Sequence, residues 1–220
     1  MDSSIENNSQ TDSLIKPYQE NLAKEMNEVL VIAAEEFPKE KDKPETKLGN
    51  LIADLSMEIA TMLYYPSDYH TIDFCFLNNG GLRTSLPKGE ITKGKIFELM
   101  PFENELVVVT ISQASFDSLV NYTKKVGGQP LSGVKFNFSS PKSAIKFKYR
   151  KNDKSLNGTY KVLTSDYLAN GGDDMSFFLN PIAYEAVGIK LRDAIIQYCI
   201  IENTNGKQLV GKLDGRISFE

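Results

Sequence analysis

The sequence predicts a single α+β domain in which a mixed β-sheet is flanked by helices. Segments with helical spacing and short apolar runs are interleaved along the 220 residues, without the strict strand–helix–strand order of a parallel sheet. Two strand-like runs end in glycine pairs, and ligands commonly bind beyond the carboxyl ends of strands. We expect residues 1–13 to form a polar, disordered lead and residues 14–220 to form the domain.

The first 125 residues are expected to contain four helices and three strands. Asp12 or Ser13 can cap the first helix, and Thr92 can cap the third. Apolar side chains spaced three or four residues apart predict helices at 14–27, 49–63, 92–99 and 115–125. Runs that are β-branched or wholly apolar predict strands at 29–34, 72–77 and 106–111, the second of them buried on both faces.

The remaining residues are expected to add strands and one helix. Alternating apolar and polar residues over 134–139 and 144–149 predict an antiparallel pair. Residues 160–164 read as a strand that leads into the second glycine loop, and residues 187–201 read as a helix. A short strand within 208–219 closes the domain.

Composition excludes several classes of function. The net charge of −4 gives no general basic surface for a nucleic-acid polymer. No apolar run approaches the roughly 20 residues that span a bilayer, and the polar N-terminus does not resemble a signal peptide. His70 is the single histidine, whereas metal-dependent phosphoesterases gather several histidine and carboxylate ligands. We therefore expect no metal or other cofactor in this chain.

The two cysteines do not form a metal-binding motif. Cys75 and Cys199 each lie in an apolar run, and their spacing is neither that of a metal site nor a CxxC pair. Buried free thiols are expected, because unpaired cysteine is among the most buried residue types. A disulfide between the two remains an alternative.

Two glycine loops and an aromatic segment carry the candidate binding residues. Asn78-Asn79-Gly80-Gly81-Leu82-Arg83 ends in a fixed positive charge, and a second loop runs from Tyr167 to Asp173. Glycine pairs let the backbone turn tightly and let a ligand approach closely. The arginine fork can donate to ribose or phosphate oxygens, and the Asp173 carboxylate can accept from two ribose hydroxyls. Phe102 and Tyr167 can clamp a base, since stacking contributes about 1–3 kcal/mol per base.

Each of these features alone is also typical of a turn or a core aromatic, but their order along the chain resembles one family. The pattern includes Gly-Asn-Leu-Ile-Ala-Asp at 49–54, the loop at 78–83, Pro-Phe-Glu-Asn at 101–104, Leu-Ser-Gly at 131–133, Leu-Ala-Asn-Gly-Gly-Asp at 168–173 and Gly-Arg-Ile at 215–217. It resembles the C-terminal, nucleotide-binding domain of the 5'-nucleotidases from about residue 21 to the end. The resemblance implies that substrate is bound by Asn78, Gly80, Gly81, Arg83, Phe102, Asn104, Gly133, Tyr167 and Asp173.

Three positions depart from the family pattern. The second stacking ring, often phenylalanine in the family, is Tyr167, which adds a hydroxyl group. The family usually has an arginine shortly before the Gly-Asn-Leu helix, where residues 41–47 offer only lysines, which clamp less directionally. Asp174 follows Asp173 where glycine is common.

In the family, an N-terminal half supplies a calcineurin-like metallophosphoesterase with two metal ions and a catalytic His–Asp pair. About twenty residues precede the matched region here, and one histidine cannot build that site. The resemblance therefore implies the nucleotide-binding subunit of a split 5'-nucleotidase, inactive alone, whose separately encoded metallophosphatase partner holds divalent metals. It also implies a periplasmic, extracellular or surface-attached location.

Three alternatives to this split enzyme stay open. The chain can be a non-catalytic module that binds a nucleotide or nucleoside. It can also be a structural domain whose pocket has decayed, or a piece of a longer enzyme. The sequence does not give the base preference, the oligomeric state or the identity of the partner.

Overall fold

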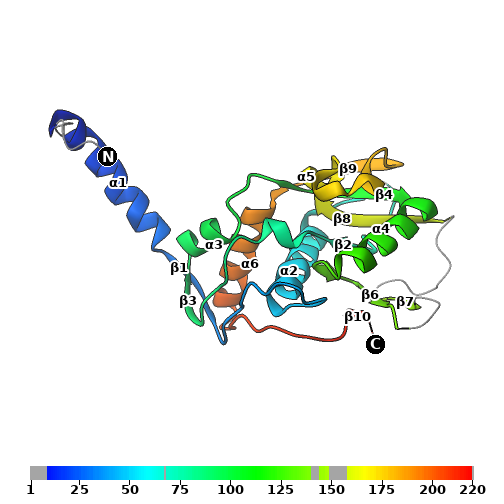
Figure 1. Cartoon of the computed structure of the whole chain (residues 1–220). Helices are drawn as coiled ribbons and strands as arrows, with labels where there is room; N and C mark the ends of the chain where they lie inside the picture. Colours follow the sequence, from blue (N-terminus) through cyan, green and yellow to red (C-terminus); the bar gives the residue numbers. More distant parts are fainter. Residues whose placement is uncertain (1–8, 67, 140–143, 149–157, 220) are drawn as a thin grey trace, which may run out of the picture.

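The computed structural model describes residues 9–66, 68–139, 144–148 and 158–219, and a mixed β-sheet lies at its centre (Figure 1). In spatial order its strands are β5 (Leu131–Ser132), β2 (Phe74–Phe76), β8 (Thr159–Ser165), β4 (Glu105–Ser112) and β9 (Ala183–Lys190). β2 and β8 are parallel neighbours, whereas the other three pairs are antiparallel. The predicted α+β domain with a mixed sheet is confirmed.

Helices cover both faces of this sheet. α2 (Lys47–Leu63) and α6 (Leu191–Thr204) pack on one face, and α4 (Gln113–Val126) packs on the other. In the short strand β2, successive side chains point to opposite faces of the sheet. Cys75 lies in the hydrophobic core under α2 and α6, whereas Phe74 and Phe76 lie in the core under α4. All three side chains are buried, as predicted for a strand covered on both sides.

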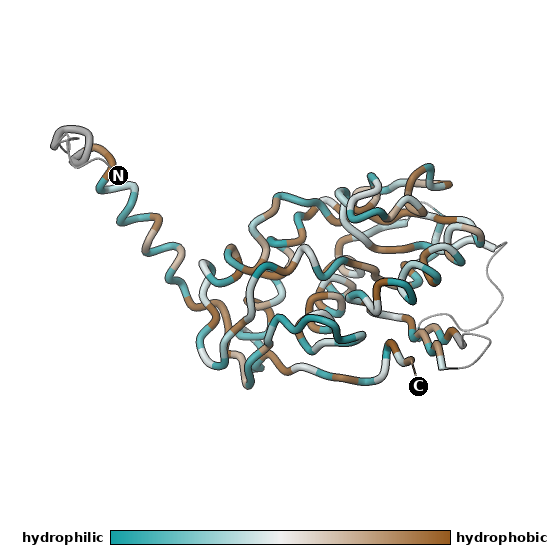
Figure 2. The backbone as a smooth tube through the Cα atoms, in the orientation of Figure 1, coloured by the Kyte–Doolittle hydropathy of each residue, from teal (hydrophilic) through white to brown (hydrophobic). Residues whose placement is uncertain are grey.

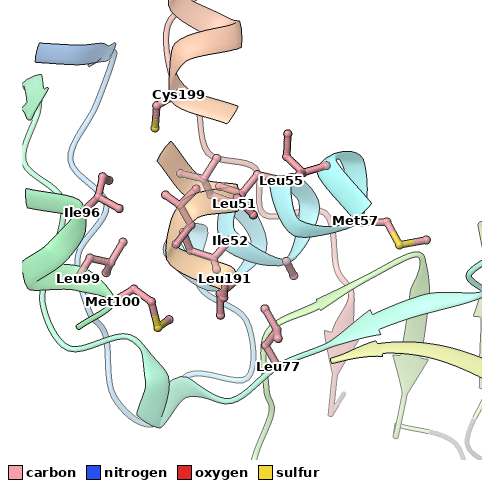
Figure 3. Packing of buried hydrophobic residues seen from close by; sticks show 14 of the residues in the cluster. Leu51, Ile52, Leu55, Met57, Leu77, Ile96, Leu99, Met100, Leu191 and Cys199 are labelled. Carbon is pink, nitrogen blue, oxygen red and sulfur yellow. The ribbon is translucent and has the colours of Figure 1, made fainter. Parts of the chain in front are cut away.

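The core between α2 and α6 is made of branched aliphatic side chains. Figure 3 shows Leu51 and Ile52 of α2 beside Leu191 of α6, with Ile96 and Leu99 of α3 (Lys93–Leu99) nearby. Complete burial of one such side chain contributes about 1.5–3 kcal/mol. This face therefore fixes α6, whose first turn lies next to the candidate site.

Both cysteines lie in the same core and do not form a disulfide. Cys75 and Cys199 are buried free thiols, which settles the alternative that the sequence left open. Burial raises the pKa of the Cys199 thiol to about 12 and raises that of Cys75 as well. Both thiols are therefore protonated and unreactive in the folded protein.

Smaller elements surround the main sheet. β1 (Val29–Ala33) pairs antiparallel with β3 (Gly89–Thr92), and α3 follows with Thr92 as its N-cap, as predicted. A three-stranded sheet joins β10 (Ile217–Ser218), β6 (Val134–Asn137) and β7 (Ala144–Phe147). α1 (Ser9–Met26) projects away from the sheet (Figure 1), and Figure 2 shows hydrophobic and hydrophilic stretches alternating along it. Leu14, Tyr18 and Leu22 of this helix are exposed.

A buried arginine near the C-terminus ties three elements together. Arg216 donates to both carboxylate oxygens of Asp54 on α2, at 2.8 and 2.5 Å, and to the carbonyl oxygen of Leu131 at 2.7 Å. Ser132 donates to the same carboxylate at 2.6 Å. A bidentate arginine–carboxylate pair is directional, so it holds β5 and the C-terminal segment at a defined place on α2.

One predicted helix boundary is wrong. Residues 187–190 were expected to begin a helix, but they form the end of strand β9, and α6 begins at Leu191. Strand and helix meet at Lys190, which is both the last residue of β9 and the N-cap of α6. Because no loop separates them, the apolar residues of the strand extend the helical pattern and hide the boundary.

Other boundaries shift by a few residues. α1 begins at Ser9, within the segment that the sequence assigned to a disordered lead and before the predicted caps Asp12 and Ser13; residues 1–8 lie outside the described part. The predicted strand pair at 134–139 and 144–149 forms β6 and β7, although residue 149 also lies outside it. The second glycine loop opens with a short helix, α5 (Asp166–Ala169), because Ser165 caps it.

Candidate nucleoside-binding site

The two glycine loops leave the sheet side by side. β2 and β8 are parallel and pair Phe74 with Val162 and Cys75 with Leu163, so both strands point their carboxyl ends to the same edge of the sheet. The first loop, residues 78–83, follows β2, and the second, residues 166–174, follows β8. The sheet topology thus brings together segments that are far apart in the sequence.

Asp173 is the point at which the two loops meet. Asn78 of the first loop donates its side-chain amide to Asp173 Oδ2 at 2.6 Å, and the Tyr167 hydroxyl donates to Oδ1 at 2.9 Å. A Cβ atom on Gly80 would lie 3.1 Å from Asp173 Oδ2, tighter than an ordinary contact. Glycine at this position lets the first loop approach the carboxylate.

The backbone around Asp173 is in an unusual conformation. Asp173 and Asp174 both have positive φ angles, +52° and +60°, and Gly171 has +84°. Aspartate visits this left-handed region more readily than most residues do. Tyr122 of α4 donates its hydroxyl to the Asp173 carbonyl oxygen at 2.9 Å. These constraints hold the Asp173 carboxylate at the surface, with its side chain directed at Asn78 and Tyr167.

Tyr167 presents its ring over Gly172. The side chain is 46% exposed, and a Cβ atom on Gly172 would lie 2.4 Å from the ring, so a larger residue there would displace the ring. The hydrogen bond to the Asp173 carboxylate raises the pKa of Tyr167. The phenol therefore remains a neutral donor at physiological pH, with a flat face open to solvent.

Arg83 connects the first loop to the aromatic segment. Its Nη1 lies 3.4 Å from the Gly80 carbonyl oxygen, and its Cζ lies 5.8 Å from the centroid of the Phe102 ring. Phe102 is 39% exposed. A continuous series of contacts thus runs from Phe102 through Arg83 and Gly80 to Asp173 and Tyr167.

Gly81 and Asn104 support this cluster through backbone geometry. A Cβ atom on Gly81 would lie 2.9 Å from Asn78 Oδ1, so glycine is needed where the Asn78 side chain folds back. The Asn104 carbonyl oxygen accepts from the Leu191 amide at 2.9 Å, which attaches the Phe102 segment to the start of α6.

Gly133 lies at the turn between β5 and β6. β5 runs antiparallel to β2 with Leu131 opposite Phe76 and Ser132 opposite Cys75. Gly133 follows directly with a φ of +85°, and its carbonyl oxygen accepts from the Lys148 amide at 2.8 Å. These contacts do not join Gly133 to Asn78, Tyr167 or Asp173.

Sequence reasoning missed the loop that supports Asn79. The Asn79 amide donates to Gln129 Oε1 at 2.8 Å, and its side chain donates to the Gly128 carbonyl oxygen at 3.3 Å. Gly127 and Gly128 form a third glycine pair directly after α4, and this signal could have indicated the loop. Tyr122 was also missed, because on a predicted amphipathic helix it looked like an ordinary half-buried residue.

Comparison with known proteins identifies the family. Residues 28–180 match the family model described as 5'-nucleotidase, C-terminal domain. The chain belongs to this family. The trifunctional nucleotide phosphoesterase YfkN of Bacillus subtilis is 30% identical over 66% of this chain and 10% of its own length. The cell wall protein Lmo0130 of Listeria monocytogenes is 28% identical over 84% of this chain and 25% of its own length.

Solved structures show the same fold. The 5'-nucleotidase precursor from Thermus thermophilus matches with a TM-score of 0.73 and 24% identity over 95% of this chain and 43% of its own. The NAD nucleotidase of Haemophilus influenzae matches with a TM-score of 0.67 and 15% identity over 97% of this chain and 42% of its own. The 5'-nucleotidase C-terminal domain described here thus spans less than half the length of these relatives.

Two of the three lysines in residues 41–47, where the family usually has an arginine, form ion pairs outside the candidate site. Lys43 forms an ion pair with Glu40 at 2.5 Å, and Lys47 forms one with Glu35. Glu35 is held in turn by the Gly211 amide at 2.9 Å. In this 5'-nucleotidase C-terminal domain, these two lysines brace the loop before α2, whereas Arg83 contacts Gly80 and Phe102 in the candidate site.

A separate pocket of about 710 Å³ lies along α2, with Met57 and Met62 of α2 and Tyr198 of α6 among its walls. None of the nine candidate site residues lines it. The candidate site is instead an open surface, on which Arg83, Phe102 and Asp173 are exposed. Among the described residues, no group of three or more histidine, cysteine, aspartate or glutamate side chains could hold a metal ion, and no helix is long and apolar enough to cross a membrane.

Proposed function

We propose that this domain binds the base and ribose of a nucleoside monophosphate, and that a separately encoded metallophosphatase half hydrolyses the phosphate ester. The observation that carries the proposal is the Asp173 carboxylate, which Asn78 and Tyr167 hold at the surface of a loop cluster that also exposes the Phe102 and Tyr167 rings. The family membership supports a nucleotide as the substrate class, and the local geometry supports the role proposed for each residue.

The Asp173 carboxylate has the capacity to bind a ribose. Each carboxylate oxygen offers about two acceptor positions. Asn78 uses one position on Oδ2 and Tyr167 uses one on Oδ1, which leaves one on each oxygen. The 2'- and 3'-hydroxyls of a ribose are two neighbouring donors of matching spacing, and hydrogen bonds to a charged acceptor are the stronger kind.

Phe102 and Tyr167 supply the apolar faces for the base. Both rings are more than one third exposed, 39% and 46%, although they belong to a residue class that is usually buried. Arg83, beside Phe102, adds a positive charge that can approach a ribose or phosphate oxygen. Stacking and one charge-assisted contact then orient the nucleoside, and this chain contributes to the reaction by positioning the substrate.

The hydrolytic chemistry is assigned to a partner. Metal-assisted phosphate hydrolysis needs ions that activate water, and the described residues contain no group that could hold one. The 5'-nucleotidase of Vibrio parahaemolyticus is 27% identical over 72% of this chain but only 28% of its own length, which leaves room in that protein for a second domain. A cell wall protein among the relatives supports an extracytoplasmic or surface location.

Calorimetry and an activity assay test this proposal together. The purified chain is expected to bind adenosine and AMP, and Asp173→Asn and Phe102→Ala variants are each expected to bind about tenfold more weakly. Asn170→Ala is the matched control, because Asn170 lies in the same loop but donates to the Asp166 carbonyl oxygen. Unchanged binding of adenosine and AMP by both site variants would contradict the proposed nucleoside site.

The activity assay separates the split enzyme from a binding module. AMP and Mn²⁺ are mixed with the chain alone, with a candidate metallophosphatase alone, and with both. Phosphate release that rises only in the mixture supports the split enzyme, whereas robust release by this chain alone contradicts it. Nucleoside binding without any gain in the mixture favours the non-catalytic module, the second candidate that the described residues support.

A further inference from the structure

Arg192, in the first turn of α6, lies beneath the segment that carries Phe102. It is only 6% exposed, although arginine is rarely buried. No sequence pattern selects it, since it follows Leu191 in what looks like an ordinary amphipathic helix. Its guanidinium group nevertheless contacts three consecutive residues of the 101–103 segment.

The contacts of Arg192 fix both the backbone and a side chain of that segment. Nη1 lies 3.4 Å from the carbonyl oxygens of both Pro101 and Phe102, and Nη2 forms an ion pair with the Glu103 carboxylate. On its other side, Cζ lies 4.2 Å from the centroid of the Phe97 ring. A single planar fork therefore connects α3, α6 and the segment between them.

Glu103 reinforces this arrangement. Hydrogen bonds from Lys190 and then Arg192 lower the pKa of the Glu103 carboxyl group to about 2, so it is ionised at physiological pH. The carboxylate also lies near the N-terminus of α6, where the helix dipole favours negative charge. The ion pair between Arg192 and Glu103 thus anchors the residue that follows Phe102.

Phe102 depends on this support more than an ordinary aromatic residue does. In the part of the chain that the structure describes, no other aromatic ring packs against Phe102, and its ring contact is with Arg83 at 5.8 Å. Within that part of the chain, the Phe102 ring therefore lacks aromatic packing that would hold it, and the backbone contacts of Arg192 bear directly on its position. The burial of Arg192 costs folding free energy, because a charged group loses its hydration and its Nε has no hydrogen-bond partner.

We propose that Arg192 is a positioning residue that holds the Phe102 ring in the orientation needed to stack on a base. This role rests on the proposed nucleoside site, and it adds to that site a residue that does not contact the ligand. It predicts that loss of the guanidinium weakens base stacking while the ribose contacts of Asp173 stay intact.

The absence of tryptophan from the sequence provides a local reporter. Phe102→Trp places one indole at the stacking position, whose fluorescence reports both ligand stacking and exposure. This reporter is combined with Arg192→Met, which keeps an unbranched side chain over Phe97 but removes the fork, and with Arg192→Lys, which keeps the charge. Lys190→Met is the matched control, since it removes the other cation on Glu103 without touching the Pro101 or Phe102 carbonyl oxygens.

In the Arg192→Met background, adenosine is expected to bind about 5- to 20-fold more weakly, and acrylamide is expected to quench the introduced indole more strongly. Arg192→Lys should restore part of the affinity, and Lys190→Met should change it by less than about twofold. The affinity ratio of adenosine to 2',3'-dideoxyadenosine should be unchanged in every variant, because Asp173 is not affected. A general loss of structure would lower that ratio as well as the melting temperature.

The outcomes separate this inference from the proposed function. If Phe102→Ala binds adenosine as tightly as the unmodified chain, the stacking site itself is wrong. If Phe102→Ala weakens binding but Arg192→Met leaves both the affinity and the quenching of the indole reporter unchanged, only the positioning role is overturned. A refolding-competent Arg192→Met protein that loses ribose discrimination in parallel with stacking would also overturn it.

Discussion

The side-chain amide of Asn78 lies 2.6 Å from Asp173 Oδ2 and joins two loops that are 95 residues apart in the sequence. Through this hydrogen bond the glycine loop after β2 and the carboxylate after β8 form one surface. Because Tyr167 holds the other carboxylate oxygen, Asp173 is oriented before any ligand arrives. A preoriented acceptor lowers the entropy that binding costs.

Replacement of Asn78 by alanine is expected to weaken nucleoside binding. The change removes one of the two side-chain donors on Asp173, and a hydrogen bond to a charged group contributes about 1.5–3 kcal/mol. We expect adenosine affinity to fall by roughly tenfold in calorimetry. The exposed neighbour Asn170 offers the comparison, and an Asn78→Ala protein that binds as tightly as Asn170→Ala would contradict the role of Asn78.

The Tyr167 hydroxyl separates stacking from carboxylate orientation. Tyr167→Phe keeps the ring but removes the donor to Asp173 Oδ1, so adenosine affinity should fall by roughly tenfold, as for Asn78→Ala. Tyr167→Leu removes the aromatic face as well as the hydroxyl and should lower the affinity by about 100-fold. Equal losses in the two variants, measured by the same titration, would mean that the hydroxyl rather than the ring contributes to binding.

Asp174→Gly is expected to stabilise the domain. Asp174 has a φ of +60°, and a non-glycine residue in the left-handed region costs about 1 kcal/mol. Relief of part of that cost should raise the free energy of unfolding by about 0.5–1 kcal/mol and the melting temperature by roughly 2–4 °C. Urea denaturation of the variant checks this, and Asp117→Gly, inside α4, should show the opposite sign.

Acid should selectively weaken the contacts of Asp68. Lys161, whose side chain is 6% exposed, donates to Asp68 at 2.6 Å, and this hydrogen bond lowers the pKa of the carboxyl group from 3.8 to about 2. A carboxyl group with a depressed pKa in the folded state contributes stability above its ordinary pKa, and that contribution disappears as the pH falls through the folded value.

The comparison of Asp68→Asn with the unmodified chain isolates this contribution. The difference in unfolding free energy between the two proteins should be constant from pH 7 to about pH 5 and should shrink between pH 3.8 and about 2. Urea titrations at pH 6, 3 and 2 measure it. A difference that grows toward low pH would show that the assigned ion pair does not stabilise the fold.

Most of the fold could be predicted from periodicity alone. Thr92, the apolar face of α2 and the wholly apolar β2 each provided a local signal that agreed with the tertiary structure. The start of α6 could not be predicted, because β9 runs into it at Lys190 without a turn residue. A boundary of this kind is set by pairing with β4, which a local pattern does not reveal.

The candidate site was predicted less completely. Glycine pairs followed by Arg83 or Asp173 indicated both loops, because backbone requirements leave a local signature. The supports Tyr122, Gln129 and Arg192 carry no such signature, since each acts across the fold through a contact that only the tertiary structure creates. Gly133 shows the reverse case, because a motif match predicted it in the site, whereas the structure shows it at the turn between β5 and β6.

The parallel pairing of β2 with β8 also limits how such a surface can be altered. Both strands end at the same edge of the sheet. An inserted or deleted residue in either strand would turn the side chains that follow it in that strand to the opposite face. Asn78 would then point toward the hydrophobic core instead of toward Asp173. New ligand preferences can therefore arise by substitution of side chains within the two loops. A change in the length of β2 or β8 would instead separate Asn78 from Asp173 and remove the binding surface.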